Sequence, residues 1–163
     1  DIFEMVEFTV DQLRALAEPK HLQLTFVKPK TGLPKIMADK EKLRQVINNL
    51  IDNAIKYTQS GQITVTLSLT AKEIILKVTD TGKGIAKEDQ KNLFEKYARA
   101  KDSSKYTSGL GLGLYLAKVI VEQHKGKIWA ESEGIGRGST FIISLPIKSG
   151  IKATATFDLA KNK

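Results

Sequence analysis

Residues 62–85 read QITVTLSLTAKEIILKVTDTGKGI, and this stretch decides the fold. It contains two runs in which apolar and polar residues alternate, Ile63–Leu69 and Ile74–Val78, separated by the short segment Thr70–Glu73. Alternation of this kind is typical of half-buried β-strands, because successive side chains of a strand point to opposite faces of the sheet. The stretch therefore predicts a β-hairpin, and Asp80 continues the apolar row of its second strand.

Helices and further strands are predicted on both sides of this hairpin. Apolar residues recur at helical spacing from Phe3 to Ala17, and again after the N-cap candidate Asp39 until near Thr58. The other expected elements are strands at 21–27, 126–133 and 138–146, a short helix at 87–97 and a helix that follows Gly113. Strands grouped with helices in this way predict an α/β fold, a two-layer α/β sandwich with a mixed, mostly antiparallel sheet packed against three helices. We expect one such domain over residues 1–147 and a C-terminal tail over 148–163.

Composition narrows the class of protein. The 163 residues are 41% hydrophobic and 27% charged, which is the profile of one globular domain. The absence of cysteine excludes disulfides, thiolate metal sites and a cysteine nucleophile, and the two isolated histidines do not make a metal cluster. The net charge of +8 comes from lysines spread along the chain. This distribution fits an anionic ligand and lacks the basic block with interleaved aromatic residues that is typical of nucleic-acid-binding proteins.

Neither a membrane-spanning segment nor a secretion signal is evident in the sequence. It has no run of about twenty apolar residues, and its N-terminus has no charged-then-apolar leader. We therefore expect a cytoplasmic domain without direct membrane contact.

The predicted helix after Asp39 has a polar face with two interpretations. Gln45, Asn49, Asn53 and Lys56 fall within about 80° of one another on a helical wheel, away from the apolar stripe. They could form an ordinary solvated face, which is the usual meaning of such a pattern. They could also form a magnesium-phosphate site, because Mg²⁺ takes one or two protein oxygens and completes its shell with water and phosphates.

Asp80 and the segment DTGKGI that it begins suggest a second binding feature. A carboxylate in an apolar row is costly unless a group donates to it, and Gly82 and Gly84 allow a flat ligand to approach the backbone. A base with an amino group would fit such a place. The alternative is that Asp80 only caps a turn.

Residues 108–118, SGLGLGLYLAK, suggest a phosphate-binding loop. Glycines just before a helix leave backbone N–H groups free to point at an anion, and the helix dipole adds a favourable potential. A flexible linker would not explain the leucines between the glycines. The preceding polar segment carries basic residues that could cover a polyphosphate as a lid: Lys96, Arg99, Lys101 and Lys105.

Taken in order, four segments resemble the N, first glycine, F and second glycine boxes of sensor histidine kinases. They are NNLIDNAIKYT (48–58), DTGKGI (80–85), LFEKYARA (93–100) and GLGLGL (109–114). Residues 122–146 are also similar to the closing strands of that family. The resemblance implies the Bergerat-type ATP-binding fold shared with gyrase, the Hsp90 chaperones and MutL, with ATP and Mg²⁺ as ligands.

The resemblance also implies roles for individual residues. Asn53 would bind Mg²⁺, Asp80 would accept from the adenine amino group, and Arg99 would contact the terminal phosphate; Asn53 and Arg99 are the catalytic candidates. Thr140 matches a threonine that holds the base through water in relatives. The full nucleotide-binding set is Asn49, Asn53, Lys56, Tyr57, Asp80, Gly82, Gly84, Ile85, Arg99, Lys105, Gly109, Leu110, Gly111, Leu112, Gly113, Leu114 and Thr140.

Kinases of this family phosphorylate a histidine on a dimerisation domain that precedes the catalytic domain. Neither His21 nor His124 stands in the context of that acceptor, so the chain resembles a catalytic domain excised from a longer protein. The implied partners are the dimerisation and phosphoacceptor domain of the same kinase and, downstream, a response regulator. Two alternatives share the fold, a conformational switch of the gyrase or Hsp90 type and an anti-sigma-type serine kinase. Both are expected to carry a water-activating or base glutamate where this chain has Asn49, and an amide is a very poor general base.

The chain departs from the family pattern at two positions of the expected lid. Lys96 stands where the F box often has proline, and Leu110 stands where threonine is frequent. The details of the lid therefore differ from the family pattern, while the N box and the first glycine box are intact.

Overall fold

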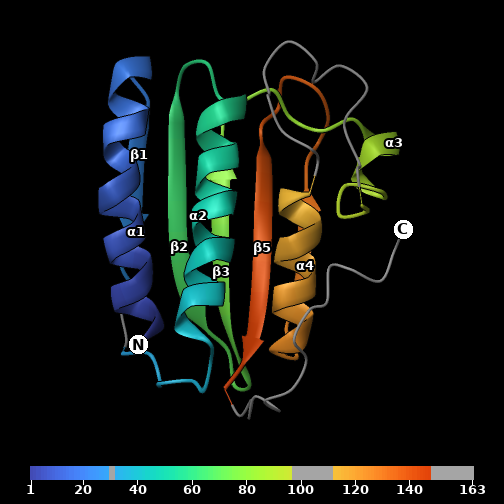
Figure 1. Ribbon diagram of the computed structural model, residues 1–163. Helices are drawn as coiled ribbons and strands as arrows, with labels where there is room; N and C mark the ends of the chain where they lie inside the picture. The colour runs from blue at the N-terminus through green and yellow to red at the C-terminus, as the bar shows by residue number, and fades with distance from the viewer. Residues whose placement is uncertain (30–31, 97–111, 148–163) are drawn as a thin grey trace.

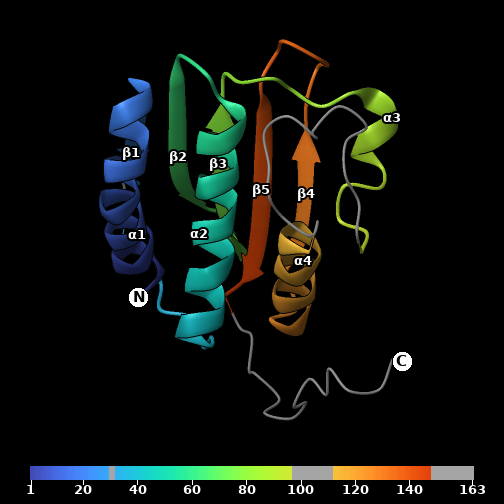
Figure 2. The same ribbon diagram turned by 45° about the horizontal axis from the view of Figure 1, so that its top comes forward.

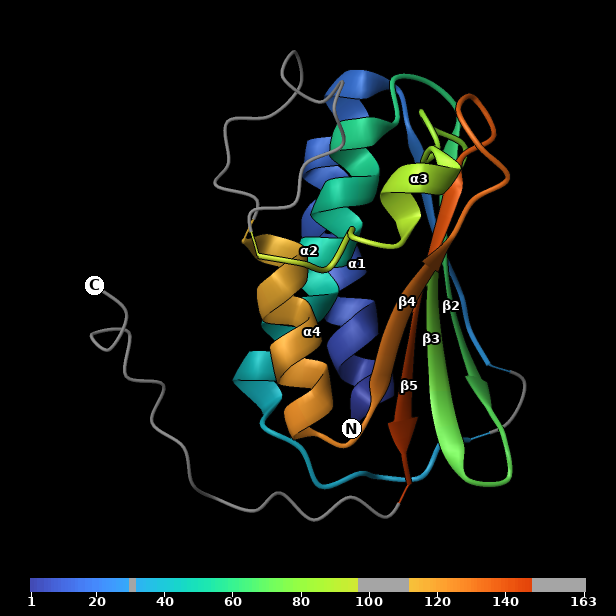
Figure 3. The same ribbon diagram turned by 90° about the vertical axis from the view of Figure 1, so that its right-hand side faces the viewer.

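The computed structural model describes residues 1–29, 32–96 and 112–147. Within these residues, a five-stranded sheet is covered on one face by three helices, and the other face is left open (Figures 1 and 3). In chain order the elements are α1 (Ile2–Ala17), the 3₁₀ helix η1 (Glu18–Lys20), β1 (Gln23–Val27), α2 (Lys40–Tyr57), β2 (Gln62–Leu69), β3 (Glu73–Asp80), α3 (Lys87–Gln90), α4 (Gly113–Gln123), β4 (Lys127–Glu131) and β5 (Ser139–Pro146). The predicted two-layer sandwich is confirmed, while the predicted tail, 148–163, lies outside the described residues.

The sheet has the strand order β1-β2-β3-β5-β4 and is mixed, as predicted. β1 runs parallel to β2, and the other neighbouring pairs are antiparallel. Figure 2 shows β4 at the edge of the sheet beside β5. In the predicted hairpin, Val65 lies opposite Val78 and Ile63 lies opposite Asp80. This register places Asp80 in the same helix-facing row as the apolar residues of β3.

The core lies between the sheet and the helices. α2 packs between α1 and α4, and its apolar stripe is fully buried, with Leu50 and Ile51 at 0% exposure. Both helices that flank α2 bury a matching stripe, which includes Val6 and Val10 of α1 and Val121 of α4. No helix among the described residues is both long enough and apolar enough to span a bilayer.

Polar contacts fix both ends of α2. Asp39 is its N-cap, as predicted, and the Asp39 carboxylate accepts from the Lys42 amide at 3.1 Å. At the other end the ammonium of Lys20 donates to the Ile55 carbonyl at 2.8 Å, where the last helical carbonyls lack partners inside the helix. The last turns of α2, which carry the polar face identified in the sequence, are therefore held in place from η1.

The short helix after the hairpin is shorter than predicted. α3 covers only Lys87–Gln90, and turns follow to residue 96 instead of further helix. The turns direct Leu93 and Phe94 into the core together, and the Phe94 ring packs edge-on against Phe141 at 6.4 Å between centroids. A helix this short gains little from its own hydrogen bonds, so burial of this apolar pair decides the local structure.

His124 is the C-cap of α4 and also reaches the start of α2. Its Nε2 accepts from the Asp39 amide at 3.0 Å, so the ring proton must be on Nδ1, which donates to the Ile120 carbonyl at 2.7 Å. His124 is only 3% exposed, so its bond to the Ile120 carbonyl is buried, while its bond to the Asp39 amide is partly buried. The neutral ring thus joins the end of one helix to the N-cap of another.

We expect His124→Ala to lower the free energy of unfolding by about 1–3 kcal/mol, because it leaves the partly buried Asp39 amide without an acceptor. Thermal denaturation followed by circular dichroism measures the loss. His21→Asn is the control, since His21 is exposed and asparagine tolerates its left-handed backbone. A melting temperature unaffected by His124→Ala would contradict the proposed bridge.

Candidate functional site

Residues from three of the four sequence boxes meet at one end of the sandwich. α2 contributes Asn49, Asn53, Lys56 and Tyr57, β3 ends at Asp80, and α4 begins at Gly113. The Tyr57 carbonyl accepts from the Lys83 amide at 3.0 Å, which ties the end of α2 to the loop after β3. The structure therefore brings together residues up to 64 positions apart, from Asn49 to Gly113.

Asp80 is the charged centre of this region. Its side chain is buried, with 4% exposure, and burial raises the pKa of the carboxyl above its ordinary value of 3.8. Hydrogen bonds partly offset this effect on the pKa: the Ser139 hydroxyl donates to Oδ2 at 2.5 Å, and the Gly82 amide donates to Oδ1 at 2.8 Å. A carboxylate has about four acceptor positions, and the Ser139 hydroxyl and the Gly82 amide occupy two of them. Asp80 thus caps its turn and still has room for one more donor.

Ser139, and not Thr140, is the β5 residue beside Asp80. Ser139 lies directly opposite Asp80 in the sheet, whereas Thr140 lies opposite Thr79 and shares a 3.1 Å hydroxyl contact with it on the open face. Thr140 therefore faces away from Asp80, and its expected contact with the base through water stays a prediction, while Ser139 supplies the hydroxyl beside the carboxylate. Strand alternation along β5 is the sequence signal for Ser139. Phe141 faces the helices, so the residue two positions before it must face the same way.

The loop after β3 depends on glycine. Gly84 has a φ of +72°, and a Cβ atom there would come within 2.1 Å of the Gly134 carbonyl oxygen. A Cβ at Gly82 would meet the Tyr57 carbonyl, the Thr58 hydroxyl and the Asp80 carboxylate, all within 2.9 Å. The bare backbone expected from DTGKGI is therefore required by close packing as well as by conformation.

Two buried polar atoms, one beside Gly82 and one beside Gly113, have no hydrogen-bond partner among the described residues. They are Asn49 Nδ2 and Thr58 Oγ1. Asn49 faces the start of α4, where a Cβ on Gly113 would lie 2.6 Å from Asn49 Oδ1. In the described part of the chain no side chain caps this helix, so its first amide groups also lack a side-chain acceptor. Unpaired donors beside an uncapped helix N-terminus favour an anionic ligand.

The structure describes only some of the remaining candidate residues for nucleotide binding. The ammonium of Lys56 pairs with Asp52 one turn earlier on α2 at 2.5 Å and stays about half exposed. Leu112 occupies the N-cap position of α4, and Leu114 lies in its first turn. Arg99, Lys105, Gly109, Leu110 and Gly111 lie outside the described residues.

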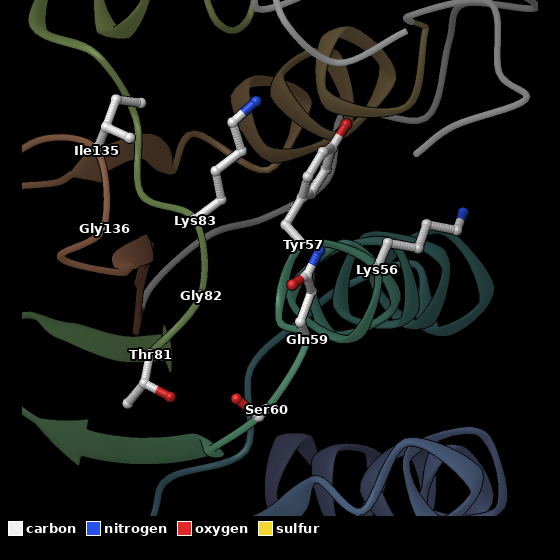
Figure 4. A pocket seen from close by; sticks show the side chains of 9 residues that line it. All are labelled: Lys56, Tyr57, Gln59, Ser60, Thr81, Gly82, Lys83, Ile135 and Gly136. Carbon is white, nitrogen blue, oxygen red and sulfur yellow. The ribbon is translucent and has the colours of Figure 1, made fainter. Parts of the chain in front are cut away.

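A cavity of about 360 Å³ opens beside the site (Figure 4). It lies between the end of α2, the loop after β3 and the loop between β4 and β5. Of the candidate residues that the structure describes, it is lined only by Lys56, Tyr57 and Gly82. Its lining is formed by Lys56, Tyr57, Gln59, Ser60, Thr81, Gly82, Lys83, Ile135 and Gly136.

Fold and site together define an α/β nucleotide-binding domain. Residues 38–149 match the family of histidine kinase-, DNA gyrase B- and HSP90-like ATPases, and the chain belongs to this family. Within it the chain is an ATP-binding domain of the sensor histidine kinase type.

Individual relatives agree with this assignment. The chain is 39% identical over 148 residues to the adaptive-response sensory kinase SasA of Synechocystis sp., an alignment that covers 90% of this chain and 38% of that protein. Its fold is similar to full-length ShkA in complex with AMPPNP, with a TM-score of 0.81 and 26% identity over 93% of this chain and 31% of ShkA. It is also similar to the nucleotide-free catalytic domain of histidine kinase ThkA, with a TM-score of 0.78 and 25% identity over 90% of this chain and 95% of that domain.

The raised pKa of Asp80 predicts a particular pH dependence of stability. As the pH rises from 3.8 to the folded-state pKa, the native protein keeps a proton that the unfolded chain has released, so its free energy of unfolding falls relative to Asp80→Asn. Above the folded-state pKa the difference should be constant. Urea denaturation of both proteins at several pH values measures it.

Asp11→Asn is the control for this experiment, because the Asp11 side chain is 59% exposed. The stability difference caused by Asp11→Asn should change little over the same pH range. If the stability of the wild type relative to Asp80→Asn rises with pH, the pKa of Asp80 is lowered in the folded state and the interpretation is wrong.

Proposed function

We propose that this domain binds Mg-ATP and transfers the γ-phosphoryl group to a histidine on the dimerisation and phosphoacceptor domain of the same kinase. The observation that carries the proposal is the pairing of the unpartnered Asn49 amide with the uncapped, glycine-led start of α4. These groups present unused donors to one place, and a polyphosphate supplies the acceptors that they lack.

Asp80 supports adenine as the base. Its carboxylate only accepts hydrogen bonds, and a remaining acceptor position suits the 6-amino group of adenine. Guanine has an oxygen at the same place, so two acceptors would face each other. Ser139 and Gly82 hold the carboxylate in position for this contact.

The polar face of α2 fits a magnesium ion between the protein and the phosphates. Asn53 lies one turn after Asn49 on the helix, and an amide oxygen is a suitable hard ligand. Mg²⁺ bound there would neutralise charge on the β- and γ-phosphates. The contribution of the chain is to hold the triphosphate between α2 and α4 while an imidazole nitrogen forms a bond to the γ-phosphorus and the bond to the bridging oxygen of ADP breaks.

Asn49 also argues against ATP hydrolysis as the main reaction. Its amide cannot take a proton from water, and its buried Nδ2 is a donor, so a water at this place has no base. The site therefore suits transfer to a nucleophile brought by another domain. A response regulator would receive the phosphoryl group from that histidine in the next step.

The domain should phosphorylate an added dimerisation and phosphoacceptor domain, taken from a relative such as SasA, when supplied with γ-labelled ATP and Mg²⁺. The label should be acid-labile, lie on the added domain alone, and accumulate slowly, because the untethered acceptor lacks the effective concentration of a joined one. Label on the isolated chain, or none on the acceptor, would contradict the proposal.

Asn53→Ala and Gln45→Ala provide the matched pair for the same experiment. Both remove an amide from the polar face of α2, but only Asn53 is the proposed metal ligand, so only Asn53→Ala should abolish transfer. By calorimetry, Asn53→Ala should weaken binding of ATP more than binding of adenosine. Equal losses for the two ligands would place the metal elsewhere.

Asp80→Asn should reduce the preference for ATP over GTP. An unpaired buried polar group costs about 1–3 kcal/mol, so the wild type should prefer ATP by roughly tenfold to a hundredfold or more. Asparagine can offer either its oxygen or its N–H₂, so ATP affinity should fall while the penalty against GTP shrinks. Competition titrations with a fluorescent nucleotide measure both affinities, and an unchanged ATP-to-GTP ratio would show that Asp80 has a purely structural role.

A further inference from the structure

The loop between β4 and β5 packs against residues 81–85, which we call the base-binding loop. We infer that Ser132 and Gln90, which belong to none of the sequence boxes, are positioning residues that set the shape of the segment 81–85 for base recognition. This inference rests on the proposed function. It adds two residues that act on the segment 81–85: Ser132, from the β4–β5 loop, and Gln90, from α3.

The backbone of the base-binding loop is bonded almost entirely to groups outside it. The Gly82 carbonyl accepts from Gly138 at 3.1 Å, and the Lys83 carbonyl accepts from Gly136 at 2.6 Å. On the other side, the Lys83 amide donates to Tyr57. The conformation of the loop is therefore imposed by its neighbours and does not come from a turn of its own.

Ser132 connects the two loops through one oxygen atom. Its Oγ accepts from the Ile85 amide at 3.0 Å and from the Gly134 amide at 3.2 Å, and it donates to the Gly138 carbonyl at 2.7 Å. Two acceptor lone pairs and one proton are the full capacity of a hydroxyl, so every position is used. Gly138 precedes Ser139, so Ser132 touches the segments on both sides of the Asp80 carboxylate.

Gln90 completes the connection from α3. Its Nε2 donates to the Ile85 carbonyl at 3.1 Å and to the Ser132 carbonyl at 2.9 Å. The two N–H groups of the side-chain amide match these two acceptors, and the pairing assigns the amide orientation. Ile85 thus has its amide held by Ser132 and its carbonyl held by Gln90.

Movement of Ile85 would be transmitted directly to the base site. Gly84, next to it, has a left-handed backbone and lies against Gly134, and a Cβ on Gly138 would come within 2.1 Å of the Asp80 carbonyl oxygen. With so little space, a shift at Ile85 changes where Gly82 and Ser139 present their donors to Asp80. Adenine affinity should therefore depend on Ser132 and Gln90 even though the proposed base contact is made by Asp80.

Two substitutions separate this role from general stability. Ser132→Ala removes the central oxygen, and Gln90→Glu keeps the shape of the side chain but places an acceptor opposite two carbonyl oxygens. Each should raise the Kd for adenosine, measured by calorimetry, by about tenfold or more. Amide hydrogen exchange of Ile85 should quicken in both variants. Ser132→Thr should keep the wild-type adenosine affinity and the slow exchange of Ile85, because threonine keeps the hydroxyl.

Thr70→Ala is the matched control for Ser132→Ala. In the β2–β3 turn, at the other end of the sheet, the Thr70 hydroxyl accepts from the Glu73 amide at 3.0 Å and donates to the Glu73 carbonyl at 3.1 Å. Loss of this hydroxyl should lower the melting temperature without changing adenosine affinity. Glu88→Gln, an exposed change on α3, is the corresponding control for Gln90→Glu and should leave affinity unchanged.

The outcomes distinguish this inference from the proposed function. If the wild type binds adenosine and the folded Ser132→Ala and Gln90→Glu variants bind it equally well, the positioning role is wrong and the proposed function stands. If Ser132→Ala does not fold, Gln90→Glu and Ser132→Thr still decide the matter by the same measurements. If the wild type binds neither adenosine nor ATP, the proposed function fails and this inference fails with it.

Discussion

The rest of the site depends on one constraint, which is that a carboxylate at the end of a central strand is buried and must be hydrogen-bonded. β3 lies in the middle of the sheet, so its helix-facing row is apolar until Asp80. Removing a carboxylate from water is costly, and the protein compensates with donors from β5 and from the loop after β3. Those donors must converge from separate segments, and this requirement shapes the loops that surround the proposed base site.

The same constraint explains why glycine and backbone contacts dominate the region. The loop after β3 brings Gly82 against the end of α2, and Gly84 against the β4–β5 loop. Side chains would fill the space through which a ligand and the neighbouring backbone approach. Two hydrogen bonds from other elements hold α2 in place. Lys20 of η1 donates to a carbonyl at its C-terminal end, and His124 at the end of α4 accepts from the amide of its N-cap. The helix that carries Asn49 and Asn53 is thereby fixed at both ends relative to the sheet.

Sequence patterns predicted the parts of the structure that depend on local periodicity. Alternation in 62–80 gave the hairpin, helical spacing gave α1 and α2, and the short polar side chain at Asp39 marked a helix start, because each signal acts within a few residues. Strand alternation from Phe141 also indicates that Ser139, and not Thr140, lies on the same face of the sheet as Asp80.

Contacts between distant segments were not visible in the sequence. Ser132 and Gln90 are ordinary polar residues in loops or short helices, and only the fold brings them within hydrogen-bonding distance of Ile85. The bond from His124 to Asp39, 85 positions away, likewise has no local signature. α3 was predicted too long because the burial of Phe94 against Phe141 outweighed helix propensity.

The strand order also determines when the base site can form during folding. Asp80 and Ser139 are separated by 59 positions, and they meet only when β5 inserts between β3 and β4. The β2–β3 hairpin closes over a few residues and can form early, whereas the β3–β5 pairing must first overcome the entropy of closing a long loop. The proposed base recognition at Asp80 would therefore be a property of the completed sheet, and a nucleotide bound there would stabilise the β3–β5 pairing over partly folded states of the chain.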